Sequence, residues 1–279
     1  MKKSQSKSLL AVLGLAGALV ACAPQKQNVV GVQADASIIG GVIVESSDVI
    51  AKTTVALVAS VVDSEGKEGQ YICTGSLIKD NVVLTAGHCV PEAKEGEKVA
   101  LYVVFTKDLN NIQRGQVRLV DKVAVHPSYG TQNDDGSDAN DIALVRFAGP
   151  KQPGYQVAQF LSDDSLLTDG AMVTLAGYGL TDGVNKTSDN KLRKVDGIEI
   201  IQSFGKTEIA LDQSKGKGAC HGDSGGPAFL TVKGVPYVWG ITSRGIGKDG
   251  VDDCSLFSLY TKINAQKTFV DQALIDLAK

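Results

Sequence analysis

Short apolar or alternating runs, rich in Val, Ile, Leu and Thr, recur from residue 53 to residue 261 and are divided by turns rich in glycine and acids. Runs of this kind are typical of β-strands and favour an all-β fold. The segment 149–154, Gly-Pro-Lys-Gln-Pro-Gly, is typical of a linker and divides the runs into two groups of six. We therefore expect two antiparallel barrels or sandwiches. The expected strands are 53–62, 71–78, 81–86, 98–105, 116–125 and 141–147 before the linker, and 172–178, 192–201, 208–211, 228–232, 235–242 and 256–261 after it.

One helix is expected, at the C-terminal end of the sequence over about 264–278. Apolar side chains recur there at helical spacing, and polar side chains occupy the other face. The apolar positions are Phe269, Val270, Ala273, Leu274 and Leu277. We expect this stripe to pack on the second group of strands.

The composition excludes several classes of protein. Of the 279 residues, 43% are apolar, which is ample for a folded core and argues against a disordered chain. The 31 glycines follow no Gly-X-Y period, so the sequence is not collagen-like. The formal net charge of -3 provides no basic surface for phosphates, so nucleic acid is not an expected partner.

The first residues have the pattern of a signal peptide, predicted over 1–21. Lys2, Lys3 and Lys7 precede an uncharged run, 9–21, that ends in small side chains. As a helix this run is about 20 Å long, short of the roughly 30 Å of a bilayer's hydrocarbon core. It is therefore not expected to span a membrane.

The end of this run permits two kinds of export. The stretch 19–22, Leu-Val-Ala-Cys, resembles the lipobox of bacterial lipoproteins, in which Cys22 becomes the lipid-modified first residue. Ordinary secretion stays open, because Ala-Cys-Ala at 21–23 also fits an A-x-A cleavage site. We expect either an outer-membrane or periplasmic lipoprotein attached to the membrane through Cys22, or a secreted protein. Residues 22–37 are the expected tether or propeptide.

The cysteine count fits an exported domain. Setting Cys22 aside leaves an even set of four, which in an oxidising compartment predicts disulfides with three pairings open. The four are Cys73, Cys89, Cys220 and Cys254. A zinc site is the alternative, but the sequence has no CxxC motif, and His88 beside Cys89 is a poor tetrahedral pair. We expect no metal.

Three residue types needed for nucleophilic catalysis occur in suitable surroundings. His88 follows a predicted strand, Asp141 opens another, and Ser224 lies in the glycine-rich segment 222–227. A serine hydroxyl is a weak nucleophile until an imidazole removes its proton, and a buried carboxylate holds that imidazole in the useful tautomer. Glycine permits positive φ there, so that the N–H groups of Gly222 and Ser224 can both face a developing oxyanion.

Four segments in order resemble the signature segments of the trypsin/chymotrypsin-like serine proteases. They are 38–41 (Ile-Ile-Gly-Gly), 85–89 (Thr-Ala-Gly-His-Cys), 141–144 (Asp-Ile-Ala-Leu) and 222–227 (Gly-Asp-Ser-Gly-Gly-Pro). The resemblance covers 38–279. It implies two six-stranded antiparallel β-barrels packed face to face, at about 50–150 and 155–262, with the active site between them.

The resemblance also implies an activity and its residues. His88 is then the general base, Asp141 orients it, Ser224 attacks the scissile carbonyl, and Gly222 with Ser224 forms the oxyanion hole. Proteins or peptides are the implied substrates, and no cofactor is expected. The alternative is a noncatalytic lipoprotein that uses a protease-like cleft for binding.

Activation and disulfide pairing follow from the same resemblance. Cleavage between Ser37 and Ile38 by an activating protease frees the Ile38 ammonium, which pairs with Asp223. Because a buried carboxylate without a cation is costly, this pairing can order the oxyanion turn. The implied disulfides are Cys73–Cys89 and Cys220–Cys254.

The substrate pocket departs from that of the trypsin subgroup. Gly218 stands where those enzymes carry an aspartate, so a preference for Lys or Arg has no counter-charge. Ser243 and Gly245 match pocket positions, Ser258 is expected on the far wall, and the pocket is expected to be open and neutral. Arg244 replaces the usual tryptophan and adds a cation from which acidic substrates can gain.

Three further features are an acidic segment and two histidines. The acidic segment 133–138 can offer oxygen ligands to calcium, but it lacks the spacing of an EF-hand loop, and a solvated loop is favoured. His126 is expected to be structural. His221, beside the glycine turn, is expected at the pocket rim, mostly solvated.

Overall fold

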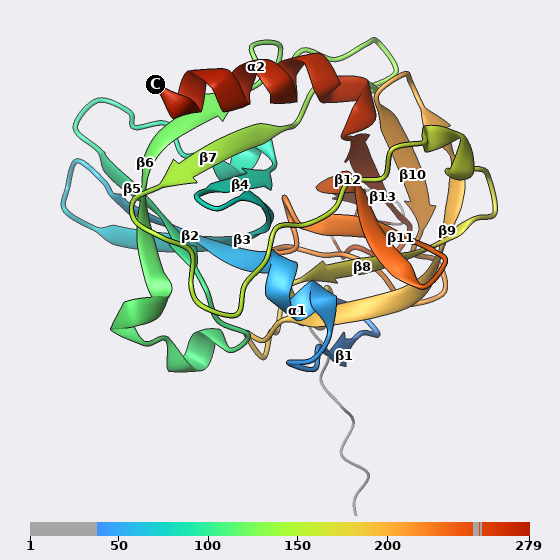
Figure 1. Ribbon diagram of the computed structural model, residues 1–279, viewed down its shortest axis with the longest axis horizontal. Helices are drawn as coiled ribbons and strands as arrows, with labels where there is room; N and C mark the ends of the chain where they lie inside the picture. The colour runs from blue at the N-terminus through green and yellow to red at the C-terminus, as the bar shows by residue number, and fades with distance from the viewer. Residues whose placement is uncertain (1–37, 248–250, 252) are drawn as a thin grey trace, which may run out of the picture. The chain divides into compact units, whose positions relative to one another are not determined.

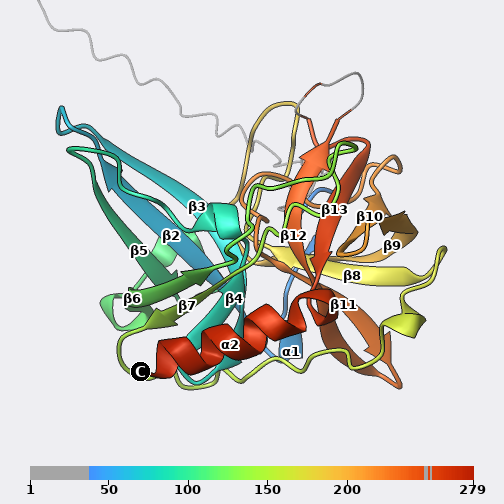
Figure 2. The ribbon, with the colours of Figure 1, turned by 90° about the horizontal axis from the view of Figure 1, so that it is seen from above.

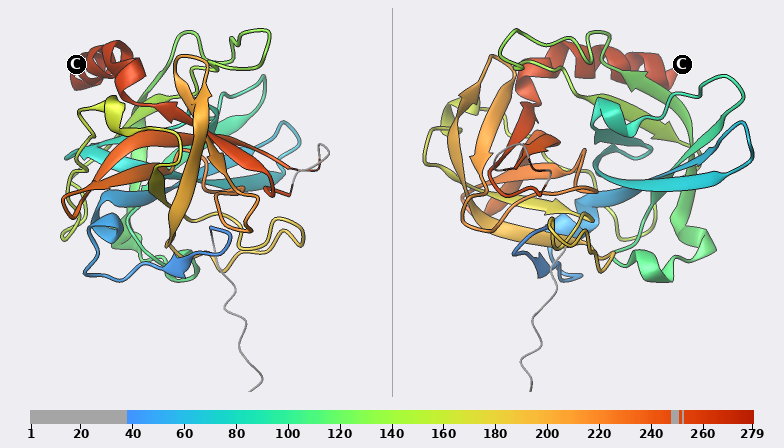
Figure 3. Two further views of the ribbon diagram at one scale, coloured as in Figure 1. Left: turned by 90° about the vertical axis from the view of Figure 1, so that its right-hand side faces the viewer. Right: turned by 180° about the vertical axis from the view of Figure 1, so that it is seen from behind.

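The computed structural model describes residues 38–247, 251 and 253–279. The predicted signal peptide, Cys22 and the predicted tether at 22–37 lie outside the described residues. The described chain forms two closed six-stranded antiparallel β-barrels, which lie side by side in the front and back views (Figures 1 and 3). This confirms the predicted all-β fold, and each of the twelve expected strands is present.

The first barrel closes in the order β2-β3-β4-β7-β6-β5. Its core lies inside the barrel, where strand alternation directs side chains such as Leu57, Leu77, Leu84 and Leu144 away from water. The strands are β2 (Thr54–Val62), β3 (Glu68–Lys79), β4 (Val82–Thr85), β5 (Lys98–Val104), β6 (Val117–Val125) and β7 (Ala143–Phe147).

The second barrel closes in the order β8-β9-β10-β13-β12-β11, and the short β1 (Val42–Ile43) adds to β9. Its core contains Trp239, Tyr260 and Leu175. The residues between β7 and β8, which include the predicted linker at 149–154, connect the two barrels. The strands are β8 (Met172–Gly177), β9 (Arg193–Phe204), β10 (Glu208–Asp212), β11 (Pro227–Val232), β12 (Val235–Ile246) and β13 (Phe257–Lys262).

The C-terminal helix α2 (Lys267–Ala278) forms as expected, after the 3₁₀ turn η6 (Asn264–Gln266). Its packing differs from the expectation: α2 lies against β6 and β7 of the first barrel, not on the second (Figures 1 and 2). Its buried side chains, Val270, Ala273 and Leu277, join the first core. The turn at η6 directs the helix across to the first barrel, where the Arg146 guanidinium donates a hydrogen bond of 2.6 Å to the Leu277 carbonyl.

A five-residue helix, α1 (Val49–Thr53), was not expected from the sequence. Its N-cap is Asp48, whose carboxylate accepts a 3.0 Å hydrogen bond from the Ile50 N–H. Single 3₁₀ turns complete the connections: η1 (Gly87–Cys89), η2 (Leu109–Asn111), η3 (Arg114–Gln116) and η4 (Asp164–Leu166). None of the helices in the described part of the chain is long and apolar enough to cross a membrane.

Two disulfides join segments near the predicted site. Cys73 of β3 is bonded to Cys89 of η1, and Cys220 is bonded to Cys254. These are the pairings that the family resemblance implies, chosen from the three that the cysteine count allows. The first fastens η1, which carries His88, to the wall of the first barrel. The second joins the segment that leads to Ser224 to the segment before β13.

Candidate active site

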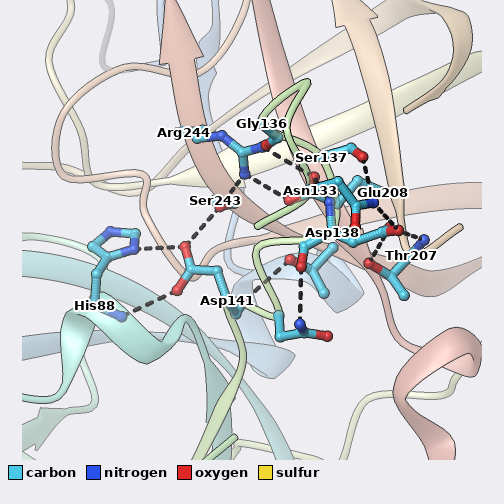
Figure 4. Close-up of polar contacts among 12 residues, drawn as sticks. His88, Asn133, Gly136, Ser137, Asp138, Asp141, Thr207, Glu208, Ser243 and Arg244 are labelled. Carbon is cyan, nitrogen blue, oxygen red and sulfur yellow. Dashed lines mark hydrogen bonds and ion pairs between the residues drawn. The ribbon is translucent and has the colours of Figure 1, made fainter. Parts of the chain in front are cut away.

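The His88 imidazole and the Asp141 carboxylate form a hydrogen-bonded pair (Figure 4). His88 Nδ1 lies 2.8 Å from Asp141 Oδ2, and the His88 backbone N–H donates to Oδ1 at 3.1 Å. Burial alone raises the pKa of the Asp141 carboxyl, but the hydrogen bonds from His88 and Ser243 outweigh it and hold the pKa below its ordinary value. Asp141 therefore stays ionised, as an acceptor that fixes the ring orientation of His88.

Ser224 lines the same cleft as His88 and Asp141. Thr74 of the first barrel holds the Ser224 segment through two hydrogen bonds. The Thr74 N–H donates to the Ser224 carbonyl at 2.8 Å, and the Thr74 hydroxyl donates to the Gly222 carbonyl at 2.8 Å. Thr74 was not expected at the site from the sequence; it is fully buried next to a disulfide cysteine.

The turn at Gly222 requires glycine. Its φ is +96°, and an added Cβ would lie 2.8 Å from the Gly179 Cα. Within the described part of the chain, the backbone N–H groups of Gly222 and Ser224 donate no hydrogen bond. An oxyanion site needs two such N–H donors that are available to a ligand beside a serine hydroxyl.

Asp223, between these two residues, points away from solvent into the protein. It is 0% exposed, and its carboxylate accepts hydrogen bonds of 2.8 Å from the N–H groups of Gly179 and Cys220. Burial raises the pKa of Asp223 to about 7 in spite of these bonds. The Ile38 side chain is fully buried in the second core. In the uncut chain its nitrogen belongs to a peptide bond and carries no charge that could pair with Asp223.

Three of the four predicted pocket residues, Ser243, Gly245 and Ser258, line the cleft with Ser224. Gly218 is not among the lining residues, although its neighbour Ala219 is. The buried side chain of Gln213, a residue that was not expected at the site from the sequence, lies beside Gly218.

The buried Gln213 side chain fills the space behind Gly218. It accepts a 2.6 Å hydrogen bond from the Ala219 N–H and donates one of 2.7 Å to the Cys254 carbonyl. A Cβ at position 218 would lie 2.1 Å from Gln213 Oε1. An aspartate therefore has no room at this position.

The Arg244 cation is already compensated. Its guanidinium pairs with Glu208, with Nη1–Oε1 at 2.6 Å and Nη2–Oε2 at 3.0 Å. The expectation that acidic substrates gain from this charge therefore loses its basis. The 133–138 loop is solvated as expected over 133–135, which are exposed, but Ser137 is buried and Asp138 accepts hydrogen bonds from the N–H groups of Lys206 and Thr207.

The remaining histidines lie where the sequence analysis expects. His221 is exposed and lines the cleft. His126 accepts a 3.1 Å hydrogen bond from the Ser128 N–H at its Nδ1 and packs edge-on against Phe269, and burial lowers its pKa. In the described part of the chain, the groups with metal-ligand spacing consist of a histidine beside two cysteines that are already disulfide-bonded.

Two closed barrels, with a histidine–aspartate pair and a serine facing one cleft, define the architecture of a chymotrypsin-like serine protease domain. Comparison with known proteins agrees: the family described as Trypsin matches residues 46–270. The chain belongs to the trypsin family.

Individual relatives are similar at modest identity. A chymotrypsin of Phaedon cochleariae is 30% identical over 193 residues, 64% of this chain and 64% of that protein. Mast cell protease 3 of Ovis aries is 32% identical over 73% of this chain and 78% of its own length. Trypsin-3 of Salmo salar is 26% identical over 75% of this chain and 85% of its own length. The chain spans about half to two thirds of the length of several curated relatives that it matches.

Proposed function

We propose that this protein is an exported serine endopeptidase with Ser224 as nucleophile, His88 as general base and Asp141 as the residue that orients His88. The observation that carries the proposal is the 2.8 Å hydrogen bond between His88 Nδ1 and the buried Asp141 carboxylate, in the cleft that Ser224 lines. With Nδ1 bound to Asp141, Nε2 is the ring nitrogen left to accept a proton from a serine hydroxyl.

The chemistry proceeds in two halves. Ser224 Oγ attacks the scissile carbonyl carbon while His88 Nε2 takes its proton, and the carbonyl oxygen becomes an oxyanion facing the N–H groups of Gly222 and Ser224. The carbon–nitrogen bond then breaks, and His88 gives the proton to the leaving amine. Water repeats the sequence on the acyl-enzyme, with His88 again as base, and releases the new carboxylic acid and Ser224.

We propose further that the protein is made as a zymogen that is cut between Ser37 and Ile38. Support comes from Asp223, a fully buried carboxyl beside Ser224 whose partners among the described residues are neutral backbone donors. An added ammonium compensates such a carboxylate. N-terminal sequencing of the active enzyme tests this step, and an active chain that is intact through Ile38 contradicts it.

The primary specificity pocket is proposed to be neutral. Ser243, Gly245 and Ser258 line it, and Gln213 occupies the space in which an aspartate at position 218 would stand. Cleavage of a peptide library tests the proposal: a dominant preference for Lys or Arg before the cut bond opposes it.

Export through a signal peptide, with or without lipid on Cys22, stays a proposal from the sequence. If Cys22 carries lipid, cleavage after Ser37 frees the protease domain from its membrane. Mass spectrometry of the mature chain identifies its first residue and any lipid on it. A chain that keeps residues 1–21 excludes both routes of export.

The variant Ser224→Ala tests the peptidase function. We expect it to remain folded and to lose peptide hydrolysis by at least about 10³-fold, because the nucleophile is gone while the cleft is intact. A fluorophosphonate probe should label the activated wild type and not the variant. If the activated wild type neither hydrolyses peptides nor takes the probe, the cleft serves binding and the proposal is wrong.

A further inference from the structure

An ion pair between a half-buried arginine and a buried glutamate lies near the predicted catalytic carboxylate. Arg244 of β12 and Glu208, the first residue of β10, form a two-pronged contact, and Glu208 is 0% exposed. A carboxylate with no access to water needs a charged partner and satisfied lone pairs. Arginine meets this need with a planar fork of donors, which the point charge of lysine does not reproduce.

The same two residues hold a loop of the opposite barrel. Arg244 Nη2 donates to the Gly136 carbonyl at 2.7 Å, and Glu208 Oε2 accepts from the Asp138 N–H at 2.9 Å. The 133–138 loop connects β6 to β7 of the first barrel, whereas Arg244 and Glu208 belong to the second. Three residues after Asp138 the chain reaches Asp141, so this contact anchors the segment that carries the carboxylate.

A second connection from Arg244 reaches Asp141 through Ser243 (Figure 4). Arg244 Nη1 donates to the Ser243 hydroxyl at 3.2 Å, and that hydroxyl donates to Asp141 Oδ2 at 2.7 Å. A hydroxyl has one hydrogen to donate. When the guanidinium occupies a lone pair of the oxygen, the hydrogen is directed toward Asp141, and the two bonds polarise each other.

We propose that Arg244, oriented by Glu208, is a positioning residue that fixes the Ser243 hydroxyl as a donor to Asp141 and thereby holds His88 in place. The inference rests on the proposed peptidase function. Arg244 touches no reacting atom in this account. Arg244 lines the cleft, but its guanidinium is held by Glu208 and the Gly136 carbonyl, and its proposed contribution passes through Ser243. We therefore expect it in kcat and not in KM.

The first test is Arg244→Lys, which keeps the positive charge but loses the fork. We expect kcat to fall about tenfold with KM within about twofold of the wild type, because one charge-assisted hydrogen bond to Ser243 is lost. An unchanged kcat, or a loss that lies in KM alone, overturns the proposal.

The matched control is Arg146→Lys. Arg146 also binds a carboxylate with two nitrogens, those to Asp121, and donates to a backbone carbonyl, that of Leu277. Unlike Arg244, it does not line the cleft. We expect the kcat and KM of Arg146→Lys to equal those of the wild type. This control separates the general cost of replacing a paired arginine from an effect on the active site.

A double-mutant cycle with Ser243→Ala decides the route. If Arg244 acts through the Ser243 hydroxyl, Arg244→Lys lowers kcat about tenfold in the wild type but less than about twofold when Ser243 is alanine. A purely structural role in holding the 133–138 loop predicts the same loss in both backgrounds. That result overturns the proposal.

Two further proteins keep the test interpretable. The wild type and Ser224→Ala are assayed alongside: a wild type without Ser224-dependent hydrolysis means that the peptidase function has failed, whereas an active wild type with additive losses refutes only the role of Arg244. If Arg244→Lys does not fold, the double variant Glu208→Gln/Arg244→Gln leaves no unpaired buried charge. This double variant should show the same loss of kcat that we expect for Arg244→Lys. A kcat equal to that of the wild type contradicts the proposal.

Discussion

Asp223 makes the stability of the uncut chain depend on pH in an unusual direction. Its carboxyl has a pKa of about 7 in the folded protein, raised chiefly by burial, against an ordinary value of 3.8. Between pH 3.8 and about pH 7, Asp223 is therefore protonated in the folded state but ionised in the unfolded state. The free energy of unfolding therefore falls as pH rises from about 4 to about 7. The loss from this one group is about 4 kcal/mol, at 1.36 kcal/mol for each pH unit.

The variant Asp223→Asn isolates this contribution, because asparagine does not titrate, and any other cost of the substitution is the same at every pH. In an uncut Ser224→Ala background, which prevents self-digestion, we expect the variant with asparagine to be less stable by about 1–3 kcal/mol near pH 4, because its NH2 group cannot accept one of the two N–H bonds that Asp223 accepts. Between pH 4 and pH 8 the stability difference should shift by about 4 kcal/mol in favour of the variant with asparagine, which becomes the more stable protein near pH 8. Other titrating groups are common to both proteins and cancel in the difference.

Urea unfolding, followed through the fluorescence of the single, buried Trp239, measures these stabilities. In a chain that begins at Ile38, the stability difference near pH 8 should have the opposite sign, with Asp223 more stable than asparagine. There the free amine is proposed to pair with Asp223, and removing one partner of a buried pair costs about 3–5 kcal/mol. A stability difference that does not change between pH 4 and pH 8 in the uncut chain refutes the reasoning.

Two other substitutions test the surroundings of the site. Gly218→Asp should not create a preference for Lys or Arg in peptide-library cleavage and should lower stability by about 2 kcal/mol, because its side chain collides with Gln213; a new Lys or Arg preference of tenfold or more contradicts this. Replacing both Cys73 and Cys89 with alanine opens a loop of sequence separation 16 and should cost about 3 kcal/mol in urea unfolding. It should also lower kcat, since this disulfide fastens the turn that carries His88; an unchanged kcat argues against that role.

The expected strands depend on local patterns and were confirmed for that reason. Alternating apolar residues direct one face of a strand inward whatever the strand pairs with, and glycine-rich segments end strands wherever they occur. The expected helix over 264–278 formed for the same reason. The predicted packing of this helix on the second barrel was wrong. The stripe of Val270, Ala273 and Leu277 indicates that an apolar surface covers the helix, but not which barrel supplies that surface.

The residues of the candidate site also differ in whether the sequence alone identifies them. His88, Asp141 and Ser224 stand in short motifs, so their residue types and surroundings could be recognised in the sequence. Thr74 and Gln213 carry no such signal. A buried threonine or glutamine is identified only by the groups that it contacts, and these come from distant parts of the chain.

The sequence by itself determined the approximate positions of the twelve barrel strands, the even set of cysteines and the three residue types of a serine protease. Only the tertiary structure decided the compensation of Arg244 by Glu208 and the anchoring of the 133–138 loop to the other barrel. Glu208 lies 36 residues before Arg244 and 70 after Asp138. Charges separated by such distances interact only after both barrels have closed and expelled the water between them, and no local pattern records that event.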